Sequence, residues 1–179
     1  ITCDLNSDLP LIHYILPKLE KIRGKKIKIH KRPNYGKVEI NFSDKDLFNK
    51  FESIGFPVGK KGISLIIPNY FSNYFDSVIA GYFATDGCLV ITNNNGIIYP
   101  RIEFSSISKT ILSQIQLYLE DKLIKGNVYI SHKINYRSNK PLFRLQINGK
   151  SNLFKFNQEI GFVNQKHQKK FNDFIKQID

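Results

Sequence analysis

Apolar residues recur along the chain with two different periods, and together they predict an α+β protein. Between Ile12 and Leu19, and again between Leu112 and Leu119, apolar side chains recur at the three- and four-residue spacing of an amphipathic helix. Four other segments alternate between apolar and polar residues, as half-buried strands do. These segments are Lys26–Lys31, Val38–Phe42, Asn127–Ile134 and Phe143–Asn148.

The same order of elements occurs twice. Leu47-Phe48 followed by Ile54-Gly55-Phe56 is matched, at identical spacing, by Leu153-Phe154 followed by Ile160-Gly161-Phe162. Each copy reads helix, strand, strand, helix, which predicts a duplicated, pseudo-symmetric unit. We expect the first repeat over residues 1–66 and the second over residues 67–179.

The second repeat has a longer leading segment, from Ile67 to Phe104. It contains a predicted short helix behind Pro68 and a hairpin that turns at Asn93–Gly96. By symmetry, a matching segment is expected to precede Ile1. The chain contains no methionine, so residue 1 is not expected to be a translation start.

The short helix, Tyr74 to Asp86, carries an unusual end. Ala80 and Ala84, like Gly81 and Thr85, are small residues four apart, and this spacing lets a second helix approach closely. Gly87 is suited to a left-handed turn that stops the helix. The helix dipole disfavours a carboxylate at Asp86, so a functional role is expected there. The alternative is an ordinary packed helix in which Asp86 is only a turn residue.

Charge and composition narrow the function. The chain has 27 Lys and Arg against 15 Asp and Glu, a net charge of +12, which favours a polyanionic partner over a merely soluble basic domain. No apolar run is long enough for a membrane span, and the first residues show no signal-peptide pattern. Neither the two cysteines nor the four histidines have zinc-ligand spacing. Serine-hydrolase and phosphate-loop motifs are also absent from the sequence.

The alternating segments predict strands with one apolar and one cationic or amide-bearing face. Such a face suits nucleic acid, because Arg, Gln and Asn pair with base edges in the major groove, although an ordinary solvated sheet is the alternative. The predicted contact residues are Lys26, Lys28, His30, Arg32, Lys37, Asn41, Arg101, Lys133, Arg137, Arg144, Gln146 and Asn148.

The segment Ile79–Gly87 resembles the nine-residue signature of the LAGLIDADG homing-endonuclease family. Ala80, Gly81, Asp86 and Gly87 match the signature, Ile79 and Phe83 keep its hydrophobic character, and Tyr82 and Ala84 depart from it. The order of elements after this segment resembles the family across nearly the whole chain.

The resemblance implies a saddle of antiparallel sheets with helices on one face. In the family, two motif helices pack side by side, and each ends in an acidic residue that binds a divalent metal over the scissile phosphate. Asp86, with Gly87 beside it, is therefore the expected metal site, and Mg²⁺ the expected cofactor if the protein is catalytic. The resemblance also implies a basic site residue at Lys61, next to Lys60. The equivalent position in the second repeat is His167, preceded by Lys166, which departs from the family.

These features predict a homing-type endonuclease that cleaves double-stranded DNA, or a remnant of one. The alternative is a non-catalytic nucleic-acid-binding protein on the same scaffold, such as an intron RNA maturase or a ribonucleoprotein component. DNA is favoured over RNA, and no membrane partner is expected. A partner motif helix is expected from an upstream segment, or less readily from a second chain. The abundance of Lys, Ile and Asn, together with two cysteines in unrelated contexts, favours an organelle (mitochondrion or chloroplast) or a prokaryotic cytoplasm over secretion.

Overall fold

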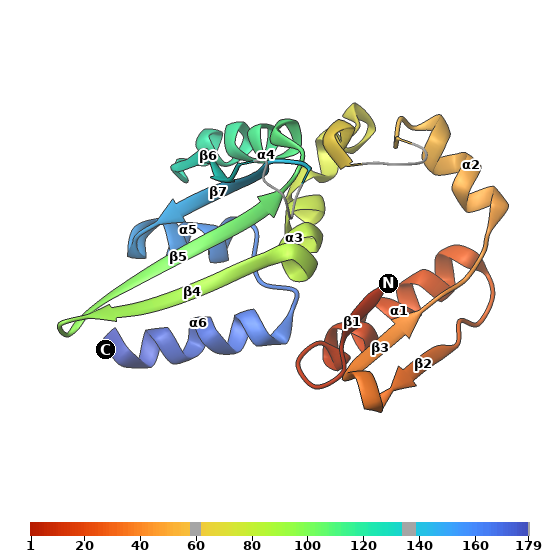
Figure 1. Ribbon diagram of the computed structural model, residues 1–179, viewed down its shortest axis with the longest axis horizontal. Helices are drawn as coiled ribbons and strands as arrows, with labels where there is room; N and C mark the ends of the chain where they lie inside the picture. The colour runs from red at the N-terminus through yellow and green to blue at the C-terminus, as the bar shows by residue number, and fades with distance from the viewer. Residues whose placement is uncertain (58–61, 134–138, 179) are drawn as a thin grey trace.

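The computed structural model describes residues 1–57, 62–133 and 139–178. The chain forms two antiparallel sheets with helices packed against them (Figure 1). The elements of the N-terminal part are β1 (Thr2–Asp4), α1 (Leu9–Arg23), β2 (Ile29–Arg32), η1 (Pro33–Tyr35), β3 (Lys37–Ile40), α2 (Lys45–Ser53) and η2 (Gly62–Ser64). The elements of the C-terminal part are η3 (Asn69–Tyr74), α3 (Phe75–Asp86), β4 (Gly87–Asn94), β5 (Ile97–Ser106), α4 (Lys109–Asp121), β6 (Gly126–His132), β7 (Leu142–Asn148), α5 (Lys150–Glu159) and α6 (Gln165–Ile178).

The two sheets share one topology. The first has the strand order β1-β3-β2, and the second has the order β4-β5-β7-β6. The series β1, α1, β2, β3, α2 therefore matches β5, α4, β6, β7, α5 in both chain order and position. In the second sheet β4 covers the outer edge of β5, whereas β1 lies at the edge of the first sheet. The predicted order of helix, strand, strand, helix is confirmed in both copies.

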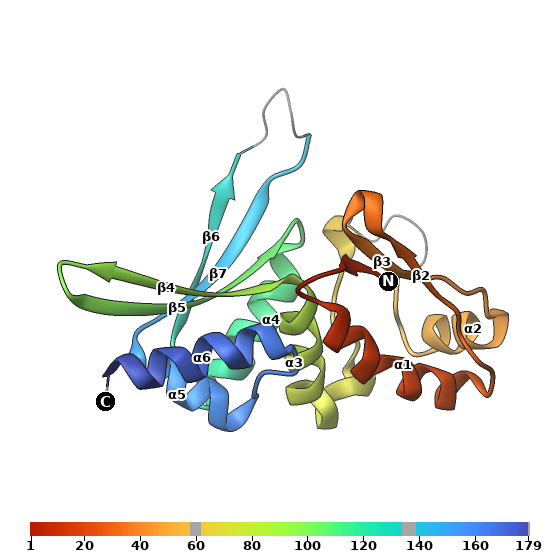
Figure 2. The ribbon, with the colours of Figure 1, turned by 90° about the horizontal axis from the view of Figure 1, so that it is seen from below.

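Each sheet has its own hydrophobic core. Ile12 of α1 packs with Val38 and Ile40 of β3 in the first. In the second, a larger cluster joins α3, α4, α5 and α6 to the sheet, and Phe83 and Phe104 lie near its centre. In Figure 2 the helices α1, α4, α5 and α6 lie below the strands, so both sheets turn their other face to the same side. The molecule is an α+β saddle, as expected.

The hairpin between β4 and β5 confirms the predicted turn. Asn94 pairs with Ile97, and the two residues between them, Asn95 and Gly96, both have positive φ angles (51° and 85°). Asparagine and glycine tolerate this conformation better than other residues, and the turn matches the twist of the strands.

Two local predictions were wrong, and two elements were not predicted. Gly87 has φ −86° and ψ 159°, which is extended rather than left-handed. Glycine is required there for another reason, because a Cβ atom would overlap the ring of Phe83. The strand predicted over Lys26–Lys31 is β2, which begins only at Ile29, so Lys26 and Lys28 precede it. The C-terminal helix α6 and the short strand β1 were not predicted.

Candidate functional site

The site is built around the last turn of α3. Ile79, Ala80, Phe83 and Ala84 are buried, and Ile79 and Phe83 anchor this helix in the second core. The aromatic ring of Phe83 packs against those of Phe104, Phe156 and Phe162. This packing holds the end of the helix in place, while Asp86 itself is exposed.

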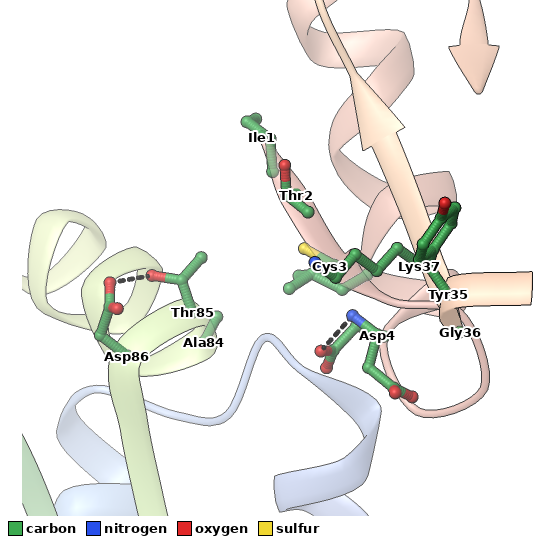
Figure 3. Close-up of a pocket in the computed structure, with 12 residues that line it drawn as sticks. Ile1, Thr2, Cys3, Asp4, Tyr35, Gly36, Lys37, Ala84, Thr85 and Asp86 are labelled. Atoms are coloured by element: carbon green, nitrogen blue, oxygen red, sulfur yellow. Dashed lines mark hydrogen bonds between the residues drawn. The ribbon is translucent and has the colours of Figure 1, made fainter. Parts of the chain in front are cut away.

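The Asp86 carboxylate lines a pocket of about 620 Å³ between α3 and the first sheet. The Thr85 hydroxyl donates a hydrogen bond of 2.9 Å to Oδ2 of Asp86. On the opposite wall lie residues of β1, the start of α1 and the turn before β3 (Figure 3). The residues lining the pocket are Ile1, Thr2, Cys3, Asp4, Asp8, Leu11, Tyr35, Gly36, Lys37, Ala84, Thr85 and Asp86.

The other two carboxylates of the pocket are already engaged. The backbone N–H groups of Asn6 and Ser7 donate to Oδ1 of Asp4, at 3.0 and 2.7 Å, and these bonds lower the pKa of Asp4. Partial burial raises the pKa of Asp8, but the bonds to Lys166 and Asn164 outweigh it, so the pKa is lowered overall. Both carboxylates are therefore charged and partnered at neutral pH, and Asp86 is the acidic group of this pocket best placed to bind a ligand.

A polar bridge ties this helix end to both halves of the chain. Asn164 is fully buried, and its Nδ2 donates to Oδ1 of Asp8 and to the carbonyl oxygen of Ala84, each at 2.9 Å. Lys166 Nζ lies 2.8 Å from the same Asp8 oxygen. Asp8 immediately precedes α1 and Asn164 immediately precedes α6. The bridge therefore fixes the last turn of α3 against the residues that precede α1 and α6.

His167 does not occupy the position expected of it. Its side chain is 2% exposed, and its ring centroid lies 4.7 Å from that of Phe83. Burial, reinforced by the charges of Lys166 and Lys170, lowers the pKa of His167 to about 4. A buried neutral imidazole does not present a cation to phosphate at pH 7, so the burial of His167 argues against the basic role expected at this position. Lys166 is the cation that reaches the bridge instead.

Some predicted site residues are not described by the structure, and two residues of the site were not predicted. Lys60, Lys61 and Arg137 lie outside the described residues. Asp8 and Asn164 were missed, although an Asp or Asn directly before a helix is a recognisable cap signal. Their pairing joins residues far apart in the sequence, so the signal would have found the caps but not the bridge.

The open face of the first sheet carries mixed charge. His30 and Lys37 are exposed, and Arg32 pairs with Glu39 at 3.0 Å between Nε and Oε2. The Asn41 amide donates to the same Glu39 oxygen at 3.4 Å. Ahead of the strand, Lys28 is exposed, and Lys26 is paired with Glu20 of α1 at 3.1 Å. The Lys26 side chain is thus directed toward α1 rather than toward the open face of the sheet.

The open face of the second sheet brings its predicted residues together. Arg101 lies opposite Asn148, and Glu103 lies opposite Gln146. Arg144 is on the same face, at 3.4 Å from Glu103. Lys133 lies just beyond β6 and is exposed. Four of the predicted contact residues therefore form one polar patch on this sheet.

The oxygen atoms at the end of α3 could supply part of the ligands of a metal site. Hard divalent cations prefer carboxylate and carbonyl oxygens, and Asp86 with the Gly87 carbonyl offers both groups at the helix end. Within the ranges that the structure describes, no group of three His, Cys, Asp or Glu residues is placed to hold a metal ion. The described part of the chain thus fits a site that is completed by other ligands. Over the same ranges, no helix is both long and apolar enough to cross a bilayer.

Comparison with known protein families gives a match over the part of the chain that contains Asp86. The family described as "LAGLIDADG-like domain" matches residues 76–161. No curated protein sequence matches the chain.

Three solved structures share the fold. A mesophilic variant of the homing endonuclease I-DmoI has a TM-score of 0.52 at 16% identity, with 90% of this chain and 78% of that chain covered. An I-DmoI variant in complex with its target DNA in the presence of magnesium has a TM-score of 0.53 at 16% identity, with 89% and 78% covered. The meganuclease I-SmaMI bound to uncleavable DNA has a TM-score of 0.55 at 12% identity, with 94% and 74% covered. At these identities the likeness shows the fold alone.

Proposed function

Because the chain belongs to the LAGLIDADG family, we propose that it binds double-stranded DNA on the open faces of its two sheets and cleaves it at Asp86. The observation that carries the proposal is the position of Asp86. Its exposed carboxylate lies in the pocket between the two halves, whereas the neighbouring carboxylates of Asp4 and Asp8 are engaged in structural bonds. A helix end that keeps one exposed carboxylate between two polar sheet faces suits phosphodiester hydrolysis at the centre of a bound duplex.

Different residues of the chain would bind the metal ion and contact the DNA backbone. Asp86 and the carbonyl of Gly87 would hold a divalent cation such as Mg²⁺, which supplies Lewis-acid stabilisation of the phosphate and a lowered pKa for an attacking water. Lys37 lines the same pocket and is exposed, so it can approach the DNA backbone. We assign the further basic role to Lys61, with Lys60 beside it, on the resemblance alone.

A second motif helix would complete the site. Gly81 and Thr85 form an exposed strip of small residues on α3, and a Cβ atom at Gly81 would meet nothing within 4 Å. Beside it, β1 is at the sheet edge, in the position that β4 covers in the other half. We propose that a helix and strand resembling α3 and β4 seat there and bring the second carboxylate. They would come from a segment upstream of Ile1 or from a second copy.

The test is metal-dependent cleavage of a plasmid library by the full natural chain, beside its Asp86→Asn variant. We expect magnesium-dependent cuts at one long site and their loss in the variant, with DNA binding retained. Binding that is tight and salt-sensitive, but without cleavage by either protein, would contradict the nuclease. It would leave a non-catalytic binder, and competition between duplex DNA and intron RNA would then identify its ligand.

A further inference from the structure

The polar patch on the second sheet is arranged around one carboxylate. Strand pairing sets Glu103 of β5 opposite Gln146 of β7, and Arg101 and Arg144 flank it. Glu103 Oε1 lies 3.8 Å from Arg101 Nε, and Glu103 Oε2 lies 3.4 Å from Arg144 Nη1. One carboxylate therefore holds two guanidinium groups side by side on the open face.

Glu103 is not itself in a position to read bases. Its side chain is only 12% exposed, and each of its oxygens is directed at an arginine. Arg101 and Arg144 are more exposed, at 36% and 30%, and each has a buried Nε with no hydrogen-bond partner in the described part of the chain. Each guanidinium carries five N–H groups, and the single contact with Glu103 engages only part of them, so the partly exposed arginines keep N–H groups that can donate to a ligand.

The two amides of the patch are engaged with each other. The Tyr129 hydroxyl donates to Oε1 of Gln146 at 2.8 Å, and Nε2 of Gln146 donates to Oδ1 of Asn148 at 2.8 Å. Each amide oxygen therefore already accepts one hydrogen bond within the patch. The two amides thus favour a ligand that accepts hydrogen bonds.

We infer that this patch is a donor surface that selects guanine in the major groove, with Glu103 as its positioning residue. The inference rests on the proposed DNA binding. Guanine presents two acceptors, N7 and O6, and the fork of an arginine matches them. Adenine presents an acceptor and a donor, and cytosine presents a donor, so both need an acceptor from the protein. The acceptors of the patch are held by Arg101, Arg144, Tyr129 and Gln146.

This departs from what the residue types alone suggest. Gln or Asn can pair with adenine by offering one donor and one acceptor from the same amide. Here Gln146 and Asn148 would have to break their mutual bond to do so. Because both guanidinium groups contact one carboxylate, the guanines they select lie close together in the half-site bound by this sheet.

The experiment is selection of bound duplexes from a randomised library by the full chain, followed by affinity measurements on the selected site. We expect two nearby positions in one half-site to be guanine. Replacing either by adenine should weaken binding by about fivefold to a hundredfold. Arg101→Lys and Arg144→Lys keep the charge and lose the fork, so each should abolish the preference at one position only.

The Glu103→Gln variant tests the positioning role. It keeps the shape of the side chain and removes the charge that holds both arginines, so discrimination should fall at both positions together while duplex binding remains. Lys169→Ala, on the exposed side of α6, removes a charge elsewhere and should change neither position. Thermal unfolding of each variant separates a folding defect from a change in specificity.

Each contrary result has its own meaning. Duplex binding without a guanine preference, or with adenine preferred at these positions, would overturn the inference and leave the proposed function intact. An effect of Glu103→Gln equal to that of Lys169→Ala would remove the positioning role. Failure to bind any duplex would overturn the proposed function and, with it, the guanine selection.

Discussion

At the scale of single residues, the surroundings of Asp86 are more constrained than its own side chain. Its carboxylate is exposed, but the residues behind it are buried. Phe83 lies in the aromatic cluster, the Ala84 carbonyl accepts a hydrogen bond from Asn164, and His167 packs against Phe83. The dipole of α3 opposes a negative charge at this end, so the residue contributes nothing to helix stability. A destabilising charge on a rigid support is the arrangement expected of a group kept for function.

Burial of His167 predicts a pH dependence of stability. Its pKa is about 4 in the folded protein and about 6.5 in the unfolded chain, so between these values only the unfolded state binds the proton. Stability is fully present above about pH 6.5 and is lost progressively as the pH falls toward 4, by about 3 kcal/mol in total. Urea unfolding at intervals across this range measures the loss.

The matched variants are His167→Gln and His30→Gln. The first should flatten the dependence between pH 6.5 and 4.5, although it lowers stability at neutral pH by disturbing the core. The second alters an exposed histidine and should leave the curve unchanged. A curve as steep in His167→Gln as in the natural protein would show that other groups cause it.

At the scale of elements, the helix ends determine the site. Gly87 joins α3 to β4 with an ordinary extended backbone, and a Cβ atom there would overlap both the ring and the backbone carbonyl oxygen of Phe83. Gly87→Ala should therefore destabilise the protein by about 1–3 kcal/mol, through displacement of a core aromatic ring.

Gly81→Ala is the matched control for that substitution. Gly81 lies in the same helix with open space around it in the 179-residue chain, so in this chain, without the proposed partner helix, alanine should stabilise the fold by about 0.5–1 kcal/mol through better helix propensity. Thermal unfolding compares the two variants. Equal effects at both positions would contradict a steric role for Gly87.

The cap of α6 makes a second prediction, one that differs from the usual rule for caps. Aspartate ordinarily replaces asparagine at a helix start with little change. Here Nδ2 of Asn164 donates to Asp8 and to the Ala84 carbonyl, so a carboxylate would face two acceptors in a fully buried position. Asn164→Asp should cost about 2–4 kcal/mol in urea unfolding, at least as much as Asn164→Ala. A neutral outcome for the aspartate would mean that the bridge contributes little.

Sequence patterning predicted the elements better than their junctions. The helices and the β4–β5 hairpin follow from local periodicity and turn chemistry, and both copies of the unit have the predicted order. The Asp8–Asn164 bridge could not be predicted, because its partners are brought together only by packing of the two halves. Gly87 shows the same limit: its glycine was recognised, but the reason depends on where the ring of Phe83 lies.

At the scale of the whole molecule, the two sheets face the same side, and the net charge of +12 has a large surface on which to act (Figure 2). Ion pairs neutralise part of it on the open faces, at Arg32–Glu39 and around Glu103. Lysines outside these pairs, such as Lys37, are therefore the better candidates for phosphate contacts, while the paired arginines suit base recognition.

This division predicts how DNA affinity responds to salt. Each phosphate contact releases about one counterion, so removing one such lysine should reduce the slope of log K against log salt by about one. Lys37→Ala should do so for every duplex sequence, whereas Arg101→Lys should change sequence preference and leave the slope as it is. Lys169→Ala, on the helical side, should leave both unchanged. A reduced slope in Lys169→Ala, with Lys37→Ala unaltered, would instead place the DNA against the helices and reverse the assignment of the two faces.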